Sequence, residues 1–345
     1  MKQLKTIFRV ATVVVISIFF ACSGGHKQAN QVEFTSNVPA AQPVEINQEA
    51  RILIDYLAEN GDYVNSRDFP SLIGADATLE SLSGKTLVID MRKPEVYANG
   101  HIKGAVNVEM KGLTDYFASK IKPFEYDKII LACYSGQSSS YSTVLLRLMG
   151  YGNVYSMRWG MSGWSPKMEN KWLDNISSDY EAQLDTTEVQ KAAPGDFPVL
   201  NSEKTSGAEI FDERIAALFD DYSNATIPAD SVFSNPEKYY IINYERKDKY
   251  DAGHIPGAVR YKPNGTLGIV AEMQTIPADR EIVVYCGTGH NSAFVTAYLR
   301  LFGYNAKTLR FGNNGFMHNK MVAEKDKLSW IPFAEADIMD YPVVK

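Results

Sequence analysis

Two cysteines of this sequence stand in matching positions where they could act as nucleophiles. Cys133 and Cys286 each end a short apolar run and begin a glycine-containing loop that leads into a helical pattern. Successive backbone N–H groups of such a loop, with the positive end of the helix, can surround an anion. We therefore expect a lowered thiol pKa, and we expect the same donors to stabilise a persulfide anion on the sulfur. Both cysteines are candidate catalytic residues, and the candidate substrate-binding residues are the other loop positions: Tyr134, Ser135, Gly136, Gln137, Ser138, Ser139, Gly287, Thr288, Gly289, His290, Asn291 and Ser292.

The two loops belong to an internal repeat. The segment 100–106 (GHIKGAV) recurs at 253–259 (GHIPGAV), a shift of 153 residues, and at this shift Cys133 meets Cys286. The glycines and the helical patterns that follow the loops keep the same register. Chance does not preserve one register over such a length, so the chain is a tandem duplication.

Within each copy, strand and helix signals alternate. Short apolar runs predict buried parallel strands at residues 86–91, 128–133 and 154–157 of the first copy. Helical spacing predicts a helix after the first loop, at 139–149, and an amphipathic helix before each copy, at 48–59 and 209–220. This order predicts an α/β fold of two tandem domains, each a mainly parallel sheet with helices on both faces.

The N-terminus has the pattern of an export signal. Lys2, Lys5 and Arg9 precede an uncharged run at 10–21, which is too short to span a bilayer but suits a signal-peptide core. The run ends at Ala21-Cys22 and resembles the lipobox of bacterial lipoproteins, in which the cysteine is lipidated. We expect an exported protein, anchored by lipid on Cys22 to a bacterial membrane at its periplasmic face. The alternative is a plain secretory signal with an unmodified cysteine.

These patterns divide the chain into five predicted parts. A signal peptide (1–21) and a flexible polar tether (22–46) precede the first domain (47–170). A polar connector (171–206), expected to pack on the domains in places, leads to the second domain (207–345).

Composition excludes several classes of protein. Of the 345 residues, 45% are hydrophobic and 22% are charged, as in folded globular proteins rather than disordered or multi-span membrane proteins. The net charge of −6 argues against nucleic acid as a partner, because phosphate binding needs a basic surface. Three cysteines are too few for a disulfide scaffold.

A motif upstream of the first loop resembles that of the rhodanese family of sulfurtransferases, through Asp90-Met91-Arg92, Glu95, Tyr97 and the segment 100–105. The first loop is similar to that of single-domain thiosulfate sulfurtransferases. The second loop begins like that of mercaptopyruvate sulfurtransferases and departs from it at residues 290–292. The second copy has Asn243 and Glu245 where the upstream motif has Asp and Arg.

The resemblance implies a ping-pong sulfur transfer that needs no cofactor or metal. A cysteine thiolate takes a sulfane sulfur from a small-molecule donor such as thiosulfate, mercaptopyruvate or polysulfide. A thiophilic acceptor, which is cyanide, a thiol or a partner protein's cysteine, then removes it. We expect Asp90, Arg92 and Glu95 to brace the loop, and the resemblance implies a structural role for His101 and His254.

Other functions stay open at this point. A phosphatase or arsenate reductase on the same fold would use an arginine to clamp its oxyanion, but the sixth positions after the cysteines are Ser139 and Ser292. A non-catalytic module that binds a partner or senses redox state is a second alternative, and an intermediate case has one catalytic domain and one scaffold. We expect the two sites to work independently, because their loops belong to separate domains. His290 could assist the thiolate or pack the loop, and a Cys133–Cys286 disulfide is the alternative to two free thiols.

Overall fold

A computed structural model describes residues 47–264, 267 and 272–345 of the chain. The predicted signal peptide (1–21), the predicted lipidation site Cys22 and the predicted tether (22–46) lie outside the described residues. Within the described part, no helix has the length and the apolar character needed to cross a membrane.

Two five-stranded sheets form the framework, and all neighbouring strands in them run parallel. Their strand orders are β1-β5-β4-β2-β3 and β6-β10-β9-β7-β8, so the two copies share one topology. The predicted α/β fold of two tandem domains is confirmed. The strands are β1 (Leu72–Ile73), β2 (Thr86–Asp90), β3 (Val106–Asn107), β4 (Lys128–Ala132), β5 (Val154–Met157), β6 (Thr226–Ile227), β7 (Tyr239–Asn243), β8 (Val259–Arg260), β9 (Glu281–Tyr285) and β10 (Ala306–Leu309).

Helices cover both faces of each sheet. In β4, the side chains of Ile129 and Leu131 join the core that contains α5, whereas Ile130 and Ala132 join a core on the opposite face, beneath α2. This alternation is the period of two that a strand buried on both faces requires. The helices are α1 (Gln48–Asn60), α2 (Ala75–Ser81), α3 (Pro94–Asn99), α4 (Leu113–Asp115), α5 (Gln137–Leu148), α6 (Gly207–Asp220), α7 (Ala229–Ser234), α8 (Lys247–Ala252), α9 (His290–Leu301), α10 (His318–Ala323) and α11 (Lys325–Leu328).

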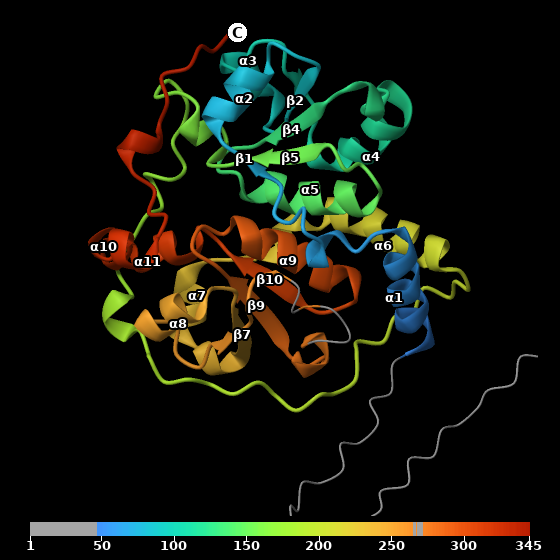
Figure 1. The fold of residues 1–345 in the computed structure, drawn as a ribbon, viewed down its shortest axis with the longest axis vertical. Coiled ribbons are helices and arrows are strands. Elements are labelled where there is room, and N and C mark those ends of the chain that lie inside the picture. Colours follow the sequence, from blue (N-terminus) through green and yellow to red (C-terminus); the bar gives the residue numbers. More distant parts are fainter. Residues whose placement is uncertain (1–46, 265–266, 268–271) are drawn as a thin grey trace, which may run out of the picture. The chain divides into compact units, whose positions relative to one another are not determined.

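The helices that follow the two cysteine loops, α5 and α9, pack against each other between the two sheets (Figure 1). Tyr141 and Leu145 of α5 and Phe294 and Leu299 of α9 are fully buried in one core that runs through both copies. Helices α1 and α6 also pack together. The two copies therefore share one core between their sheets, while each copy keeps a separate core on the other face of its sheet.

The segment that follows each copy crosses to the other copy. After the first copy, Asp185 pairs with His254 through backbone hydrogen bonds of 2.9 Å in both directions. After the second copy, Val344 pairs in the same way with His101, again at 2.9 Å. The two histidines are equivalent in the repeat, so the exchange is reciprocal.

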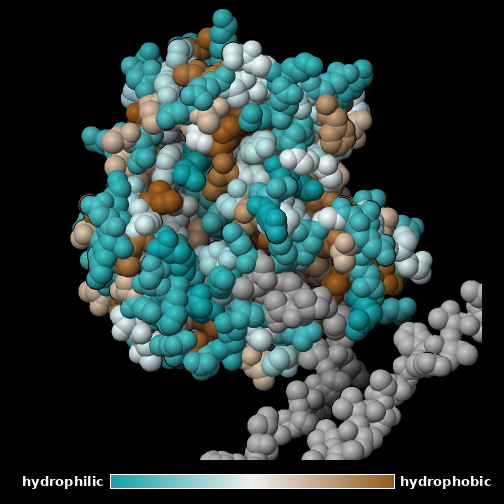
Figure 2. Space-filling model, viewed as in Figure 1, coloured by the Kyte–Doolittle hydropathy of each residue, from teal (hydrophilic) through white to brown (hydrophobic). Residues whose placement is uncertain are grey.

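On the face seen in Figure 2, apolar residues form small separate patches among hydrophilic ones. Among the residues that the structure describes, Phe124 is the most exposed of the large hydrophobic side chains, at 74%.

Candidate active site

Cys133 follows β4 directly, at the point where the chain turns toward α5. The loop needs glycine at Gly136, because this residue has a φ of 87°, in the left-handed region. The N–H groups of Gly136 and Ser139 donate to Cys133 Sγ at 3.1 and 3.4 Å, and the thiol donates to Ser139 Oγ at 3.4 Å. Cys133 itself is only 2% exposed. The loop thus aims backbone N–H groups at a buried sulfur, an arrangement that suits negative charge there.

Cys286 has the matching place between β9 and α9. Gly289 has a φ of 74°, and the N–H of Ser292 donates to Cys286 Sγ at 3.4 Å. The difference lies in Glu245, which stands where the first copy has Arg92. Its Oε1 accepts the N–H of Gly287 at 2.5 Å, so a carboxylate of the protein already occupies one donor of this loop.

The expectation of a lowered thiol pKa is wrong for Cys286. Burial raises the pKa of this thiol, and the negative charge of Glu245 raises it further. Hydrogen bonds from Thr288 and Ser292 act in the opposite direction without offsetting these effects. Burial also raises the pKa of the Glu245 carboxyl, against the attraction of Lys249, whose Nζ is 3.4 Å from Glu245 Oε2. The second loop therefore favours a neutral thiol.

A second turn in each copy, after β5 and after β10, hydrogen-bonds to the backbone of the cysteine loop. In the first copy, Trp159 has a φ of 65° and is followed by Gly160, and the N–H of Met161 donates to the carbonyl of Cys133 at 2.8 Å. A Cβ on Gly160 would collide with this carbonyl, so glycine is required there. The second copy repeats the arrangement around Gly312.

Side chains of the two loops reach into the opposite copies. Gln137 Oε1 accepts the N–H of Phe311 at 2.8 Å. His290 Nε2 lies 3.2 Å from the carbonyl oxygen of Ser135 and 3.4 Å from the N–H nitrogen of Trp159. The loops are therefore in contact with the opposite copies rather than separate from them, and the independent working of the two sites stays a prediction. His290 packs and bonds the first loop, although it lies four residues after the second cysteine.

Sequence reasoning missed Trp172, which lies in the polar connector. This side chain is fully buried, and its Nε1–H donates to the carbonyl of Ser135 at 3.0 Å. Its ring lies 4.7 Å from that of Trp159 and 5.5 Å from that of Phe333, with His290 stacked at 5.7 Å. The only signal in the sequence is a tryptophan within a polar stretch, which a surface connector does not require.

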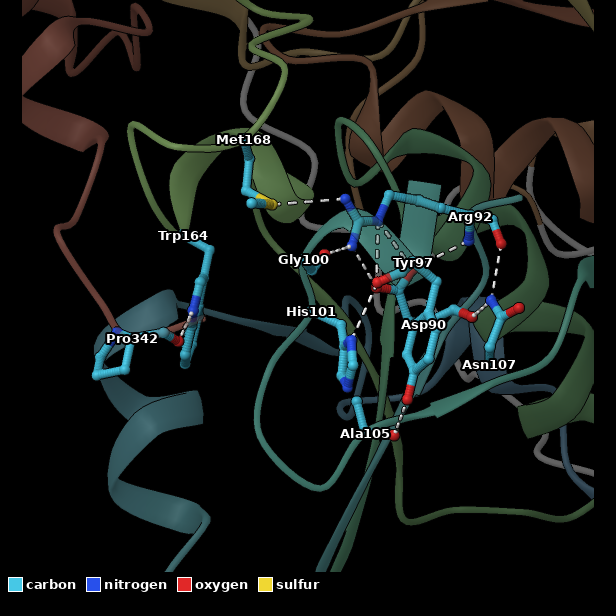
Figure 3. A network of polar contacts seen from close by, with 10 residues as sticks. All are labelled: Asp90, Arg92, Tyr97, Gly100, His101, Ala105, Asn107, Trp164, Met168 and Pro342. Carbon is cyan, nitrogen blue, oxygen red and sulfur yellow. Dashed lines mark hydrogen bonds and ion pairs between the residues drawn. The ribbon is translucent and has the colours of Figure 1, made fainter. Parts of the chain in front are cut away.

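Asp90 and Arg92 form a buried ion pair beside the first loop (Figure 3). Arg92 Nη2 lies 2.6 Å from Asp90 Oδ2, the two residues are 2% and 1% exposed, and Nη2 also donates to the carbonyl of Gly100 at 2.7 Å. Asn107 Nδ2 donates to the backbone carbonyls of both residues. Of the three residues expected to brace the loop, Asp90 and Arg92 form this buried pair, whereas Glu95 is exposed.

The two repeated histidines make similar local contacts. His101 Nδ1 lies 3.0 Å from the carbonyl of Tyr97, and the two rings stack at 3.8 Å (Figure 3). His254 does the same with Tyr250, at 2.8 and 3.7 Å. These contacts close the turn after α3 and α8, and they fit the structural role implied by the resemblance.

A cleft of about 480 Å³ opens beside the first loop. Residues of both copies line it, including two from the loop itself: Tyr134, Ser138, Met91, Glu109, Met110, Lys111, Phe219, Asp220, Tyr222 and Ser223. At the position equivalent to Met91, the second copy has Tyr244, which is 1% exposed.

Both cysteines are free thiols, so the alternative of a Cys133–Cys286 disulfide is not what the structure has. The remaining predicted loop residue, Asn291, is half-buried in the first turn of α9. In the described ranges, no group of three or more His, Cys, Asp or Glu side chains is placed to hold a metal ion.

The fold and the site define a class of protein: tandem α/β domains, each with a cysteine on a loop between a parallel strand and a helix. Rhodanese-like domains are recognised at residues 75–167 and 233–319, which together make up just over half of the chain. The chain therefore belongs to the rhodanese family, with two tandem rhodanese-like domains.

Two curated relatives are each named thiosulfate sulfurtransferase GlpE. The protein of Pseudomonas entomophila is 34% identical over 79 residues, which are 23% of this chain and 69% of the relative. The protein of Pseudoalteromonas translucida is 34% identical over 96 residues, or 27% of this chain and 88% of the relative. Among solved structures, a thiosulfate sulfurtransferase from Pseudomonas aeruginosa aligns at 16% identity with a TM-score of 0.28, covering 77% of this chain and 48% of that one.

Proposed function

We propose that this rhodanese-like sulfurtransferase carries sulfane sulfur as a persulfide on Cys133 and passes it to a thiophilic acceptor. One observation carries the proposal: Cys133 Sγ accepts two backbone N–H groups, at 3.1 and 3.4 Å, in a loop that borders an open cleft. Backbone donors fixed in this way stabilise a charge that moves from the thiolate to the outer sulfur of a persulfide. The relatives named thiosulfate sulfurtransferase support thiosulfate as a donor.

The proposed reaction has two displacements. The Cys133 thiolate attacks the outer sulfur of thiosulfate, an S–S bond forms at the cysteine, and sulfite leaves with the electron pair of the broken S–S bond. The acceptor, cyanide or a thiolate, then attacks the outer sulfur of the persulfide. Thiocyanate or a new persulfide leaves, and the Cys133 thiolate is restored. No proton needs to be held by a neighbouring base, in line with a nucleophile activated by its surroundings.

We propose a slower or purely supporting role for the second domain. Glu245 beside Cys286 raises the pKa of that thiol and would also repel a dianionic donor. This favours the alternative in which one domain turns over and the other is a scaffold. Mercaptopyruvate and polysulfide remain candidate donors, and a partner protein's thiol remains a candidate acceptor.

The test is a donor panel on the wild type, Cys133→Ser and Cys286→Ser. Thiosulfate, mercaptopyruvate and polysulfide are each supplied with cyanide, and thiocyanate formation measures turnover. Mass spectrometry of the two cysteine peptides detects the sulfur added to each. We expect Cys133→Ser to abolish turnover and Cys286→Ser to retain most of it. Turnover that survives Cys133→Ser and is lost in Cys286→Ser contradicts the assignment, and absence of sulfur on either cysteine with every donor contradicts the proposed function.

We also propose export and a lipid anchor on Cys22. The support is the basic start, the apolar run at 10–21 and the cysteine that follows a small residue. Several acyl chains on one cysteine hold a protein stably on a membrane, whereas one chain does not. Cys22→Ser should release the full-length protein from the membrane fraction or leave it unprocessed, whereas Ser23→Ala should not. Unchanged mature mass and fractionation in Cys22→Ser would contradict the anchor.

A further inference from the structure

The carbonyl of Ser135 connects Cys133 to parts of the molecule outside the first cysteine loop. This carbonyl belongs to the same peptide group as the N–H of Gly136, which donates to Cys133 Sγ at 3.1 Å. A trans peptide group is planar, and its C=O and N–H point in opposite directions. Any group that fixes the carbonyl of Ser135 therefore also fixes the direction of the N–H toward the sulfur.

Two side chains from outside the first copy hold this carbonyl. Trp172 of the connector donates its Nε1–H to the Ser135 oxygen at 3.0 Å. His290 of the second copy places Nε2 3.2 Å from the same oxygen. Both side chains are completely buried, so water does not compete for these positions.

The state of the His290 ring follows from its partners. Thr288 Oγ1 lies 2.8 Å from Nδ1 and has a hydroxyl proton to donate there. We assign the ring proton to Nε2, which then donates to the Ser135 carbonyl at 3.2 Å, the shorter of its two contacts; the approach of the Trp159 N–H to Nε2, at 3.4 Å, is then not a hydrogen bond. Burial, together with the positive charge of Arg158, lowers the pKa of His290 to about 3. The ring is therefore neutral near pH 7 and works as a hydrogen-bond donor rather than as an acid.

We propose that Trp172 and His290 are positioning residues for Cys133. By hydrogen bonding to the carbonyl of Ser135, they orient and polarise the Ser135–Gly136 peptide so that its N–H stabilises negative charge on the sulfur. The inference rests on the proposed function, since the stabilised species are the thiolate and persulfide of that reaction. It extends that function in one respect: the second copy and the connector supply part of the first site.

The variants are chosen to remove one donor each. Trp172→Phe keeps a large buried ring and removes the indole N–H. Trp164→Phe is the matched control, because Trp164 is also buried and donates its Nε1–H to a backbone carbonyl, that of Pro342, at 3.0 Å (Figure 3). His290→Leu removes the second donor, and His290→Gln returns an amide N–H near the position of Nε2.

The measurement is alkylation of Cys133 by iodoacetamide as a function of pH, followed on the Cys133 peptide by mass spectrometry in the full chain. In Trp172→Phe and His290→Leu we expect the midpoint of alkylation to move to higher pH and the rate near pH 7 to fall about three- to tenfold. The rate should recover at high pH, where the thiolate is fully formed; a general packing defect would instead expose the buried sulfur and change the rate at every pH. His290→Gln should lie between, and Trp164→Phe should follow the wild type.

Trp172→Phe and His290→Gln are compared once their melting temperatures are shown to lie near that of the wild type. The proposal is overturned if both variants show the pH profile of Trp164→Phe, and if His290→Leu either shows this profile too or fails to fold. Alkylation involves no sulfur transfer. Failure of the proposed function, seen as no sulfur on Cys133 with any donor, is therefore recorded separately from failure of this inference.

Discussion

Gln137 and His290 are equivalent residues of the two copies, and the side chain of each ends on the backbone of the opposite copy. Gln137 Oε1 accepts the N–H of Phe311 at 2.8 Å, and His290 Nε2 lies 3.2 Å from the carbonyl of Ser135. The pairing is symmetric in position but not in chemistry, since Gln137 accepts a hydrogen bond from the turn at Phe311 whereas His290 contacts the cysteine loop itself. The two cysteine loops are therefore unequal parts of one assembly.

Replacing Glu245 by glutamine should activate Cys286. The substitution removes a negative charge that raises the pKa of the Cys286 thiol, while the amide oxygen can still accept the N–H of Gly287. Burial remains, so the pKa falls without reaching that of an exposed thiol. Alkylation of the Cys286 peptide near pH 7 should become several-fold faster, whereas the exposed control Glu237→Gln should have no effect. An unchanged rate in Glu245→Gln would show that burial alone governs this thiol.

Breaking the buried ion pair should cost far more stability than breaking a surface pair. Arg92→Met leaves the Asp90 carboxylate buried without its partner, which costs about 3–5 kcal/mol in the free energy of unfolding. The control is Lys122→Met, because Lys122 and Glu125 are 81% and 68% exposed and such a pair contributes about 0–1 kcal/mol. Urea unfolding measures both. Equal losses in the two variants would contradict a stabilising role for the buried pair.

Charge in the cleft should govern the affinity for anionic donors. Two carboxylates, Glu109 and Asp220, and one ammonium group, Lys111, line the cleft. Because the negative charges outnumber the positive one, a dianionic donor meets net repulsion there. The double variant Glu109→Gln, Asp220→Asn should lower KM for thiosulfate about two- to fivefold with kcat little changed, and added salt should shrink the difference. Lys111→Met should raise KM. The exposed control Glu80→Gln should match the wild type, and equal KM values in all variants would exclude this cleft as the donor route.

The neutral His290 should make the protein less stable in acid. Its pKa is lowered to about 3 in the folded chain, against about 6.5 when unfolded, so the unfolded state binds one more proton between these pH values. Stability therefore falls as pH falls through this window, by up to about 1.4 kcal/mol per pH unit. His290→Gln should remove this contribution, seen as a flatter dependence of urea unfolding on pH. Parallel curves for the two proteins would mean that the ring takes up its proton in the folded state as well.

Local pattern was sufficient for the longer central strands and for helix α5, but not for the short elements β1, α2 and β3 or for the partners of each element. The predicted strand at 154–157 is β5, and the predicted helix at 139–149 is α5, which begins two residues earlier because Gly136 takes the left-handed conformation. Gln137 and Ser138 are polar and add nothing to an apolar period, so the pattern could not place the start. The motif containing Asp90 and Arg92 did indicate residues that the structure brings together beside the loop.

The contacts between the copies could not be predicted from the sequence. Trp172 and His290 meet the carbonyl of Ser135 from 37 and 155 residues away, and no periodicity within a segment encodes such a partner. The thiol pKa of Cys286 was predicted with the wrong sign, because the loop pattern displays the N–H donors but not the depth of burial or the direction of the Glu245 side chain.

The segment after the second copy, which pairs with the first copy, affects the order in which the chain can fold during synthesis. Val344 completes the backbone pairing of His101, and Tyr341 packs on Trp164 with ring centroids 5.1 Å apart, although both follow the entire second copy in the sequence. Domains generally fold in order as they leave the ribosome. Here the half that emerges first receives its last partners only when residues 341–344 have been added. We therefore expect the nascent first half to persist as an incomplete intermediate until these residues have left the ribosome.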